Sequence, residues 1–321
     1  MVTKKVLVLG ASGQIGRHLI RKLTKNNYVV TAVTRNLHQK GYSLKTQSPI
    51  GFLEIIEANI FNQEKLNNII KNHEICINLI GILFEKKNNT FQNIHVNFPS
   101  ILSKICKENN IEKLIHISAL GIEKSIDSNY AISKLEGENK IKNSFQGAVI
   151  LKPSIVYSVD DNFTTNFMTL LNRLPFMPLY YEGKTKFTPI HVTDLAQIIF
   201  DVVHGKVNEQ TIECVGPEIF SFKEIIIKLL KAIDKKRLLI PLPLALAKMS
   251  AKIFELMPNP LLTTDQLNLL KYDNIASGKY KTNFDLGIGA NRIFDKEIEK
   301  YSFNWREGGQ YSKDKFLNKN Q

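Results

Sequence analysis

Short apolar runs alternate with amphipathic stretches throughout the first half of the chain. The apolar runs are KVLVLG, YVVTAVTR, FLEIIEANI, EICINLIG, KLIHISAL and GAVILKPS, and amphipathic stretches separate them at 14–26, 63–72, 91–109 and 130–143. Buried strands that alternate with helices of this length indicate βαβ units. The pattern predicts an α/β fold with a doubly wound parallel sheet, in which six strands are complete by Lys152.

The hydrophobic pattern is less regular in the second half. It predicts a helix over 163–173, a short strand within FTPIHV, and a helix that starts at Thr193 or Asp194. Ser221 is a candidate cap for the helix FKEIIIKLLKAI, because a serine hydroxyl accepts a hydrogen bond from the first turn of a helix.

A buried strand over 211–215 is expected to rejoin the main sheet. The last third of the chain reads as mostly helical, with turns at PNP and LGIGAN. At 321 residues, the chain is long enough for one large α/β domain with an appendage or for two domains. We therefore expect a first domain over 1–157 and a smaller, mostly helical C-terminal lobe over 158–321.

The stretch VLVLGASGQIGRHLI places three glycines between the first predicted strand and the first helix. Glycine allows the backbone to turn tightly and approach a diphosphate, and the helix N-terminus offers N–H groups and the positive end of its dipole. We predict that 1–157 is a Rossmann-like NAD(P)-binding domain, although a purely structural glycine turn is the alternative. The predicted cofactor contacts in this loop are Gly10, Ser12, Gly13, Gln14, Ile15 and Gly16.

The end of the second strand carries an arginine where NAD-binding domains carry a carboxylate. Arg35 follows Thr34 at this position, and an arginine there suits the 2′-phosphate of NADP. Arg17, directly after the third glycine, is a candidate for a second contact with the same phosphate. Each arginine could equally be an exposed surface charge. NADP(H) is therefore the favoured cofactor, and NAD(H) is the alternative.

Two asparagine positions close the third and fourth strands. Asn59 could meet the adenine, and the backbone from Asn78 to Gly81 could pass close beneath the cofactor, because ligands bind at the carboxyl ends of parallel strands. Either asparagine could instead form an Asx turn or cap a helix. Pro153, at the end of the sixth strand, completes the predicted cofactor-binding set.

The stretch IHISALGIEKSIDSNYAISKLEG could bring three reactive side chains together. Ser118 ends the fifth strand, and Tyr130 and Lys134 share one face of the next helix because they are four residues apart. The lysine ammonium is expected to lower the tyrosine pKa. Tyr130 could then transfer a proton, Ser118 could polarise a substrate oxygen, and Lys134 could bind the nicotinamide ribose. Such a pair also arises by accident on helices, so catalytic turnover is left open.

Composition narrows the range of partners and compartments. The formal net charge is +13, with lysines scattered among other residues, which favours a solvated surface and leaves attraction to anionic lipid as the alternative. Nucleic-acid-binding signatures are not found.

The residues Cys76, Cys106 and Cys214 lack the spacing of a zinc site, so no metal is predicted and a reducing compartment is expected. The first apolar run is too short for a signal peptide, so we expect a cytoplasmic protein.

Taken together, these motifs resemble the short-chain dehydrogenase/reductase superfamily, in its atypical extended form. The stretches GASGQIGRH, YAISK, EGKTKFTPIHVTDLA, LMPNPLLTTDQLNLLKYDN and FNWREGGQY resemble more narrowly the NAD(P)H-binding accessory subunit of respiratory complex I, NADH:ubiquinone oxidoreductase. The resemblance implies a tightly bound NADPH with a mainly structural or regulatory role and complex I subunits as partners. Relatives are also linked to ubiquinone biosynthesis.

The sequence departs from the family pattern at LKPSIVYSVDD. The resemblance implies an arginine at Lys152 and a glycine–proline pair at Ser158 and Val159. The leading expectation is a complex I-associated accessory or assembly subunit, at the cytoplasmic face of the inner membrane. A free NADPH-dependent reductase or epimerase that uses Tyr130, Lys134 and Ser118 is the alternative, and a redox-sensing regulator is a third class.

The stretch LPLALAKMSAKIFELM predicts an amphipathic helix, whose apolar face could contact a partner. Lys248, Lys252 and Glu255 form a narrow polar stripe and leave a broad apolar face. The helix is too short and too charged to span a bilayer. Core packing of that face is favoured, and contact with a partner or a peripheral membrane surface is the alternative.

Overall fold

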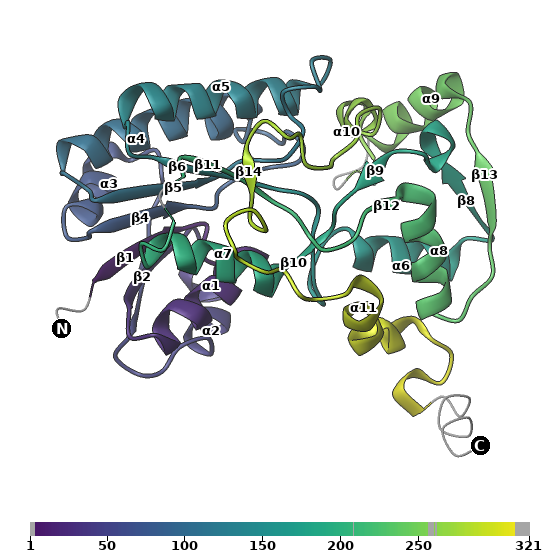
Figure 1. The fold of residues 1–321 in the computed structure, drawn as a ribbon, viewed down its shortest axis with the longest axis horizontal. Coiled ribbons are helices and arrows are strands. Elements are labelled where there is room, and N and C mark those ends of the chain that lie inside the picture. The colour runs from purple at the N-terminus through teal and green to yellow at the C-terminus, as the bar shows by residue number, and fades with distance from the viewer. Residues whose placement is uncertain (1–3, 208, 256–259, 261, 312–321) are drawn as a thin grey trace.

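The first strand shows how the sheet is buried. Val6 and Val8 of β1 (Lys5–Leu9) pack into the hydrophobic cluster on one face of the sheet, and Leu7 and Leu9 pack into the cluster on the other. Successive side chains of a strand point to opposite faces, so a strand that is apolar at every position must be covered on both sides. The computed structural model describes residues 4–207, 209–255, 260 and 262–311, and its sheet is sandwiched between two layers of helices (Figure 1).

The large sheet confirms the predicted fold class. It has eight parallel strands in the order β3-β2-β1-β4-β5-β6-β11-β14, so the chain reverses its direction of winding between β1 and β4. The six predicted strands are β1 to β6, and the predicted strand at 211–215 is β11, which pairs with β6. The remaining strands are β2 (Val29–Thr34), β3 (Leu53–Glu57), β4 (Ile75–Asn78), β5 (Lys113–Ile117), β6 (Val149–Pro153), β11 (Thr211–Cys214) and β14 (Lys281–Thr282).

Helices cover both faces of this sheet (Figure 1). One layer contains α1 (Gln14–Lys25), α2 (Leu37–Lys45) and α7 (Val192–Val203), and the other contains α3 (Gln63–Ile70), α4 (Phe98–Glu108) and α5 (Asn129–Ser144). The sequence pattern did not predict α2, because this helix buries only Gly41 and Leu44 and therefore has almost no apolar periodicity.

Several helix boundaries differ from the prediction by one or two residues, and one predicted helix changes its type along its length. The predicted helix over 91–109 starts with a π-helical segment, η1 (Gln92–Asn97), before α4. The helix expected to start at Thr193 or Asp194 starts at Val192, since His191 accepts a hydrogen bond from the Thr193 N–H. Ser221 does cap its helix, α8 (Phe222–Ala232), in a reciprocal capping box.

The second lobe lies beside the carboxyl end of the sheet (Figure 1). Side chains from three helices meet in its core, including Met168 of α6, Leu229 of α8 and Ile298 of α11. Three two-stranded sheets pair β7 with β10, β9 with β12, and β8 with β13. Its elements are β7 (Val156–Tyr157), α6 (Thr164–Arg173), β8 (Phe176–Leu179), η2 (Tyr180–Gly183), β9 (Lys186–Phe187), β10 (Ile190–His191), β12 (Phe220–Ser221), β13 (Leu238–Pro241), α9 (Leu244–Phe254), α10 (Thr264–Leu269), α11 (Phe294–Ser302), η3 (Phe303–Trp305) and η4 (Gly309–Tyr311).

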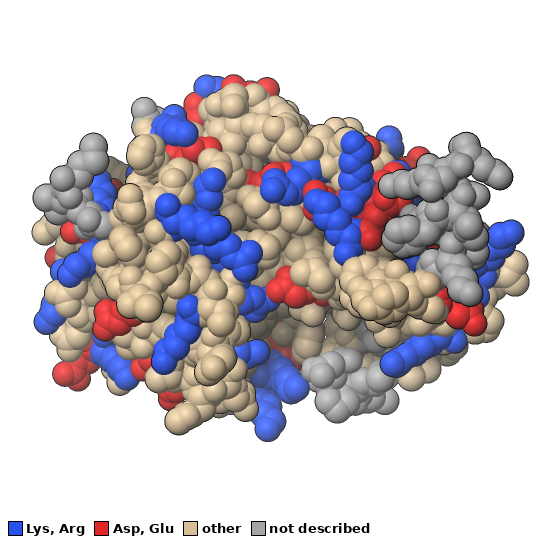
Figure 2. Space-filling model, turned by 90° about the horizontal axis from the view of Figure 1, so that it is seen from below, with Lys and Arg blue, Asp and Glu red and all other residues tan. Residues whose placement is uncertain are grey.

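Charged side chains of both signs are spread over the face of the molecule drawn in Figure 2. Figure 2 shows one face of the molecule, on which Lys and Arg lie among uncharged residues with Asp and Glu between them. In this view the formal charge of +13 is not gathered into one basic surface.

One cation lies inside the sheet, at the position where the family pattern implied an arginine. Lys152 of β6 is 1% exposed and pairs with Glu138 of α5 at 2.9 Å and with Glu123. Burial alone would lower the pKa of Lys152, but the two carboxylates outweigh it and raise this pKa. The ion pair therefore joins the central sheet to the helix that carries Tyr130 and Lys134.

Lys152→Met is expected to lower the free energy of unfolding by about 3–5 kcal/mol, because it leaves Glu138 as a buried charge without its close partner. Lys142→Met is the matched control, since Lys142 lies 3.9 Å from the same carboxylate but is 35% exposed. Its loss should stay below about 1 kcal/mol. Urea unfolding of both variants would contradict this assignment if the two losses were equal.

Candidate functional site

A cleft opens where the winding of the sheet reverses. The strands β1 and β4 are neighbours, but the helices that follow them lie on opposite faces, and crevices of this kind bind ligands in α/β proteins. The cleft has a volume of about 700 Å³. Of the predicted cofactor contacts, it brings together Gly10, Ser12, Gly13, Arg35, Asn59 and Gly81.

The glycine loop has the geometry that a diphosphate requires. Gly10 has a φ of +79°, and a Cβ atom there would lie 3.1 Å from the Leu79 carbonyl carbon. Gly16 lies against the turn that follows β1, where a Cβ atom would come within 2.3 Å of the Ala11 carbonyl oxygen. Gly13 is the N-cap of α1 and is exposed in the cleft, so the first N–H groups of this helix face a space without a capping side chain.

Charges of both signs line the far end of the cleft. Arg35 follows β2, and Lys65 of α3, which the sequence analysis missed, lies on the same lining. Glu57 reaches this corner from β3, and its Oε2 accepts a hydrogen bond from the Leu37 N–H at 2.7 Å. A carboxylate is therefore present, but it comes from the neighbouring strand, which the local pattern around β2 could not reveal.

Both asparagines form the Asx turns that were kept as alternatives. Asn59 Oδ1 accepts a hydrogen bond from the Phe61 N–H at 3.1 Å, and Asn59 also lines the cleft. Asn78 Oδ1 accepts from the Ile80 N–H at 3.0 Å, and the residue is fully buried. Asn78 therefore shapes the backbone that leads to Gly81.

Arg17 is not among the residues that line the cleft, and its side chain has partners elsewhere. Its guanidinium pairs with Asp160, in the loop after β7, and donates to the Ser12 carbonyl at 2.6 Å. Gln14 points to the same loop and donates to Ser158 Oγ at 2.8 Å. The predicted contacts Gln14 and Arg17 thus join the start of α1 to the second lobe.

Two further predicted contacts do not line the cleft. Ile15 packs against the hydrophobic cluster beneath the sheet. Pro153 is buried in β6, where its carbonyl accepts a hydrogen bond from the Leu120 N–H at 3.0 Å. The sequence spacing put both residues near the carboxyl ends of strands, but their side chains belong to the packed interior.

Ser118 and Lys134 Nζ both lie at the end of β5. Lys134 Nζ donates to the Ile117 carbonyl at 3.0 Å and lies 3.3 Å from the position that a Cβ of Gly81 would occupy. Ser118 Oγ is buried and has no hydrogen-bond partner in the described part of the chain. A buried polar atom without a partner is unfavourable unless a ligand or water satisfies it.

Tyr130 lies against an aromatic cluster that the sequence analysis missed. Its ring meets His95 with a centroid distance of 5.3 Å and Phe91 with one of 5.9 Å. His95 belongs to η1, and it approaches α5 because Gly137 has no side chain: a Cβ there would come within 1.8 Å of the His95 carbonyl oxygen. No local sequence signal distinguishes His95 from an ordinary helical residue, since only packing brings it to Tyr130.

The pKa values of Tyr130 and Lys134 are both shifted by burial. For Tyr130, the shift is opposite to the expected one. Burial raises the pKa of Tyr130 to about 12, and the negative charge of Asp265 contributes to this rise. Burial also lowers the pKa of Lys134 to about 8. The prediction that Lys134 lowers the Tyr130 pKa was therefore wrong for this structure, because burial and the Asp265 charge both raise this pKa.

The second lobe supplies the carboxylate that acts on Tyr130. Asp265 of α10 accepts hydrogen bonds from the Asn129 N–H at 2.6 Å, the Tyr130 N–H at 3.1 Å and Ser128 Oγ at 2.9 Å. It therefore caps the N-terminus of α5, where a negative charge is favoured by the helix dipole. The sequence motif around Asp265 marked the family, but its contact with α5 joins residues far apart in the chain.

These features fit an adenine dinucleotide that lies across the cleft. Gly10, Gly13 and Gly16 form a backbone cradle, and the buried Ser118 hydroxyl lacks a partner at the other end. At neutral pH the Tyr130 hydroxyl keeps its proton, so it can donate a hydrogen bond but is a weak base. Among the described residues, no group of three or more His, Cys, Asp or Glu side chains could hold a metal ion.

Comparison with known proteins identifies the family. A family model described as the NAD dependent epimerase/dehydratase family matches residues 6–213, which is more than half of the chain. The chain belongs to this family.

Two curated relatives match beyond this region. The chain is 23% identical over 283 residues to the NADH-ubiquinone oxidoreductase 40 kDa subunit of Neurospora crassa, covering 88% of this chain and 74% of the relative. It is 25% identical over 314 residues to the NADH dehydrogenase (ubiquinone) 1 alpha subcomplex subunit 9 of Arabidopsis thaliana, covering 94% and 78%. Among solved structures, the Bordetella bronchiseptica enzyme WbmG in complex with NAD is similar in fold, with a TM-score of 0.69, 14% identity and 94% of each chain covered.

Lys134→Met is expected to stabilise the ligand-free protein at neutral pH, by up to about 3 kcal/mol, because it removes a charge that burial disfavours. In the wild type, the buried charge of Lys134 lowers the free energy of unfolding by its full amount below pH 8, where Lys134 is charged in both folded and unfolded states. This destabilisation disappears between about pH 8 and 10.5, so the stabilisation by Lys134→Met should shrink over this range.

Thermal unfolding of both proteins across this pH range measures the effect. Lys140→Met is the control, because Lys140 is exposed on the same helix and its replacement should change little at any pH. A gain from Lys134→Met that did not depend on pH would contradict the assigned pKa shift.

Proposed function

We propose that this member of the NAD dependent epimerase/dehydratase family binds NADP(H) and serves as an accessory or assembly subunit associated with NADH:ubiquinone oxidoreductase, complex I. The observation that carries the proposal is the extent of the similarity to the two complex I subunits. It covers 88% and 94% of this chain, whereas the family model ends at residue 213. The similarity thus extends into the C-terminal lobe, a region in which the sequences of complex I subunits and of family enzymes can differ.

The cleft supports the cofactor part of the proposal. The diphosphate would lie at the N-terminus of α1 beside Gly13, and the adenosine would lie over the ends of β2 and β3. Among the residues that the structure describes, Arg35 and Lys65 are cations on this lining that favour a 2′-phosphate, and Glu57 is an opposing charge. NADP(H) is therefore preferred over NAD(H) in the proposal.

The tyrosine environment supports a cofactor-retaining role. When bound, a nicotinamide supplies hydride chemistry, and a tyrosine base would need a pKa near the working pH. Burial instead raises the Tyr130 pKa to about 12, and Asp265 adds to the shift. The pair is therefore better suited to binding the nicotinamide end than to removing a proton from an alcohol.

One observation favours a second function, that of a free NADPH-dependent reductase or epimerase with a role in quinone metabolism. The Ser118 hydroxyl is buried without a partner, and Tyr130 holds a proton that it could deliver to a carbonyl oxygen during reduction. The chemistry of Ser118, Tyr130 and Lys134 therefore suits a reduction better than an oxidation.

The proposal also assigns partners and a location. Complex I subunits are the proposed partners, in keeping with the names of the two relatives. We place the protein in the cytoplasm, in peripheral contact with the cytoplasmic face of the inner membrane.

Arg35→Asp is expected to lower the affinity for NADPH by about tenfold or more and to leave the affinity for NADH nearly unchanged, because only NADPH carries a phosphate at this position. Isothermal titration calorimetry with both nucleotides measures the ratio. Arg21→Asp makes the same charge change outside the cleft lining and serves as the control. Equal losses for NADPH and NADH in Arg35→Asp would remove Arg35 as a specificity determinant.

Tyr130→Phe and Gly13→Val separate the structural role from catalysis. We expect Tyr130→Phe to retain NADPH and to co-purify with complex I as the wild type does. Gly13→Val places a side chain in the cleft at a backbone φ of −72°, which valine can adopt, so it should lose NADPH and most of its association with the complex without unfolding.

Affinity purification of each tagged variant, with bound nucleotide measured after release, tests this expectation. Failure of the wild-type protein to co-purify with complex I would overturn the subunit assignment. Turnover of a carbonyl substrate that Tyr130→Phe abolishes would instead establish the reductase function.

A further inference from the structure

Helix α9 keeps its large apolar side chains on the surface. Leu246, Met249 and Ile253 are 47%, 57% and 58% exposed, and their spacing of i, i+3 and i+7 places them on one side of the helix. The helix buries only Ala247 and Ala251. The predicted packing of its apolar face in the core was therefore wrong, since small alanines, rather than the large aliphatic residues, make the contact with the lobe.

Large apolar side chains are also exposed on β13, the element that precedes α9. The two elements are separated only by Leu242 and Pro243, and they lie at the end of the second lobe that is farthest from the large sheet (Figure 1). Leu238 and Ile240 of β13 are 71% and 43% exposed, and Phe176, which pairs with Leu238 in β8, is 48% exposed. Large exposed apolar side chains that gather in one region of a protein mark an interaction site.

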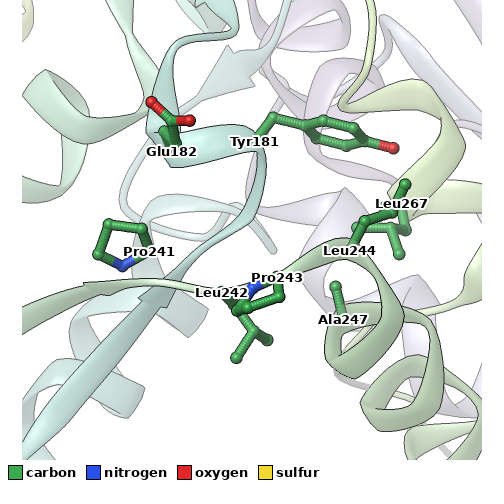
Figure 3. A pocket seen from close by; sticks show the side chains of 8 residues that line it. All are labelled: Tyr181, Glu182, Pro241, Leu242, Pro243, Leu244, Ala247 and Leu267. Carbon is green, nitrogen blue, oxygen red and sulfur yellow. The ribbon is translucent and has the colours of Figure 1, made fainter.

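An apolar hollow lies beside the first turn of α9 (Figure 3). It has a volume of about 320 Å³, and Leu244 and Ala247 of α9 line it together with Tyr181 and Leu267. Figure 3 shows the Tyr181 ring extending toward Leu267, with the Glu182 carboxylate turned away from these side chains. The apolar character of the surface therefore continues into this hollow.

The charges on the same segment have one sign. Residues 235–254 contain five cations and no carboxylate. Lys248 and Lys252 are exposed four residues apart on α9, next to the apolar stripe. The acidic residue that follows, Glu255, is turned to α10 and accepts a hydrogen bond from the Thr264 N–H at 2.6 Å. The five cations of 235–254 are Lys235, Lys236, Arg237, Lys248 and Lys252, and of these Lys235 pairs with Glu307 at 3.4 Å.

We propose that the segment 235–254 is a docking surface for a bilayer that contains anionic lipids. Helix α9 would lie in the plane of the interface, with Leu246, Met249 and Ile253 inserted and the lysines at the level of the phosphates. The inference rests on the membrane contact in the proposed function and assigns its surface. No helix in the described part of the chain is long and apolar enough to cross a membrane.

Residue types favour lipid over protein as the occupant. The centres of protein interfaces are enriched in aromatic residues and arginine and depleted of lysine. The exposed face of α9 has the opposite composition, with aliphatic side chains and two lysines. Leucine and lysine on adjacent sides of one helix are typical of helices that bind the membrane surface.

Vesicle flotation with the full-length protein tests the proposal. The wild type should float with vesicles of phosphatidylcholine and phosphatidylglycerol in equal parts, and much less with pure phosphatidylcholine. Lys248→Glu with Lys252→Glu should lower the partition coefficient by about 25-fold or more, because each cation near an anionic surface contributes about a fivefold factor and the new carboxylates are repelled. Met249→Asp with Ile253→Asp should lower it at least as much, by opposing insertion.

Ile50→Asp is the matched control, since Ile50 is fully exposed in the first domain and its replacement should leave flotation unchanged. No flotation of the wild type, or undiminished flotation of Met249→Asp with Ile253→Asp, would overturn the proposal. If these variants instead lost complex I while the wild type failed to bind vesicles, the surface would belong to a protein partner, which also overturns it. Flotation without co-purification with complex I would uphold the lipid surface and reject the subunit assignment.

Discussion

The close approach of α1 to the turn that follows β1 is the constraint on which the site depends. A Cβ at Gly16 would lie 2.3 Å from the Ala11 carbonyl oxygen, so only glycine lets the helix start where it does. This contact aims the N-terminal N–H groups of α1 at the cleft and leaves Gly13 exposed at its wall. The reversal of winding between β1 and β4 keeps the space above this loop open. The cleft is thus a consequence of backbone geometry and topology, to which side chains add specificity.

The C-terminal lobe completes the other end of the site. Asp265 caps the helix that carries Tyr130, and Asn274 donates to the Leu120 carbonyl at 2.7 Å and accepts from Ser154 Oγ at 2.6 Å. The loop between β5 and α5 is therefore held against the second lobe. This arrangement buries Tyr130 and places a carboxylate beside it, and both effects keep its phenol protonated. The same lobe exposes α9 at its outer end. Its helix α10 therefore contacts the nucleotide site, whereas α9 faces the surroundings of the protein.

Sequence reasoning was most successful where a property is local. The apolar runs of β1 to β6 and the three glycines predicted the parallel sheet and the diphosphate loop, because strand burial and close backbone approach leave direct marks on residue type. It missed α2, whose weak periodicity reflects its shallow packing. It also misjudged α9, because an apolar stripe is the same in sequence whether it is buried by the protein or left on its surface.

The sequence by itself determined the α/β fold class, the place of the nucleotide loop and the pairing of Tyr130 with Lys134 on one helix. Only the tertiary structure decided that Arg17 pairs with Asp160, that Glu57 shares the corner of Arg35, and that Asp265 reaches the start of α5. The physical reason is distance along the chain. Periodicity and glycine placement act over a few residues, whereas burial and charge depend on which remote segments fold against each other, and they set the pKa values and partners of the site.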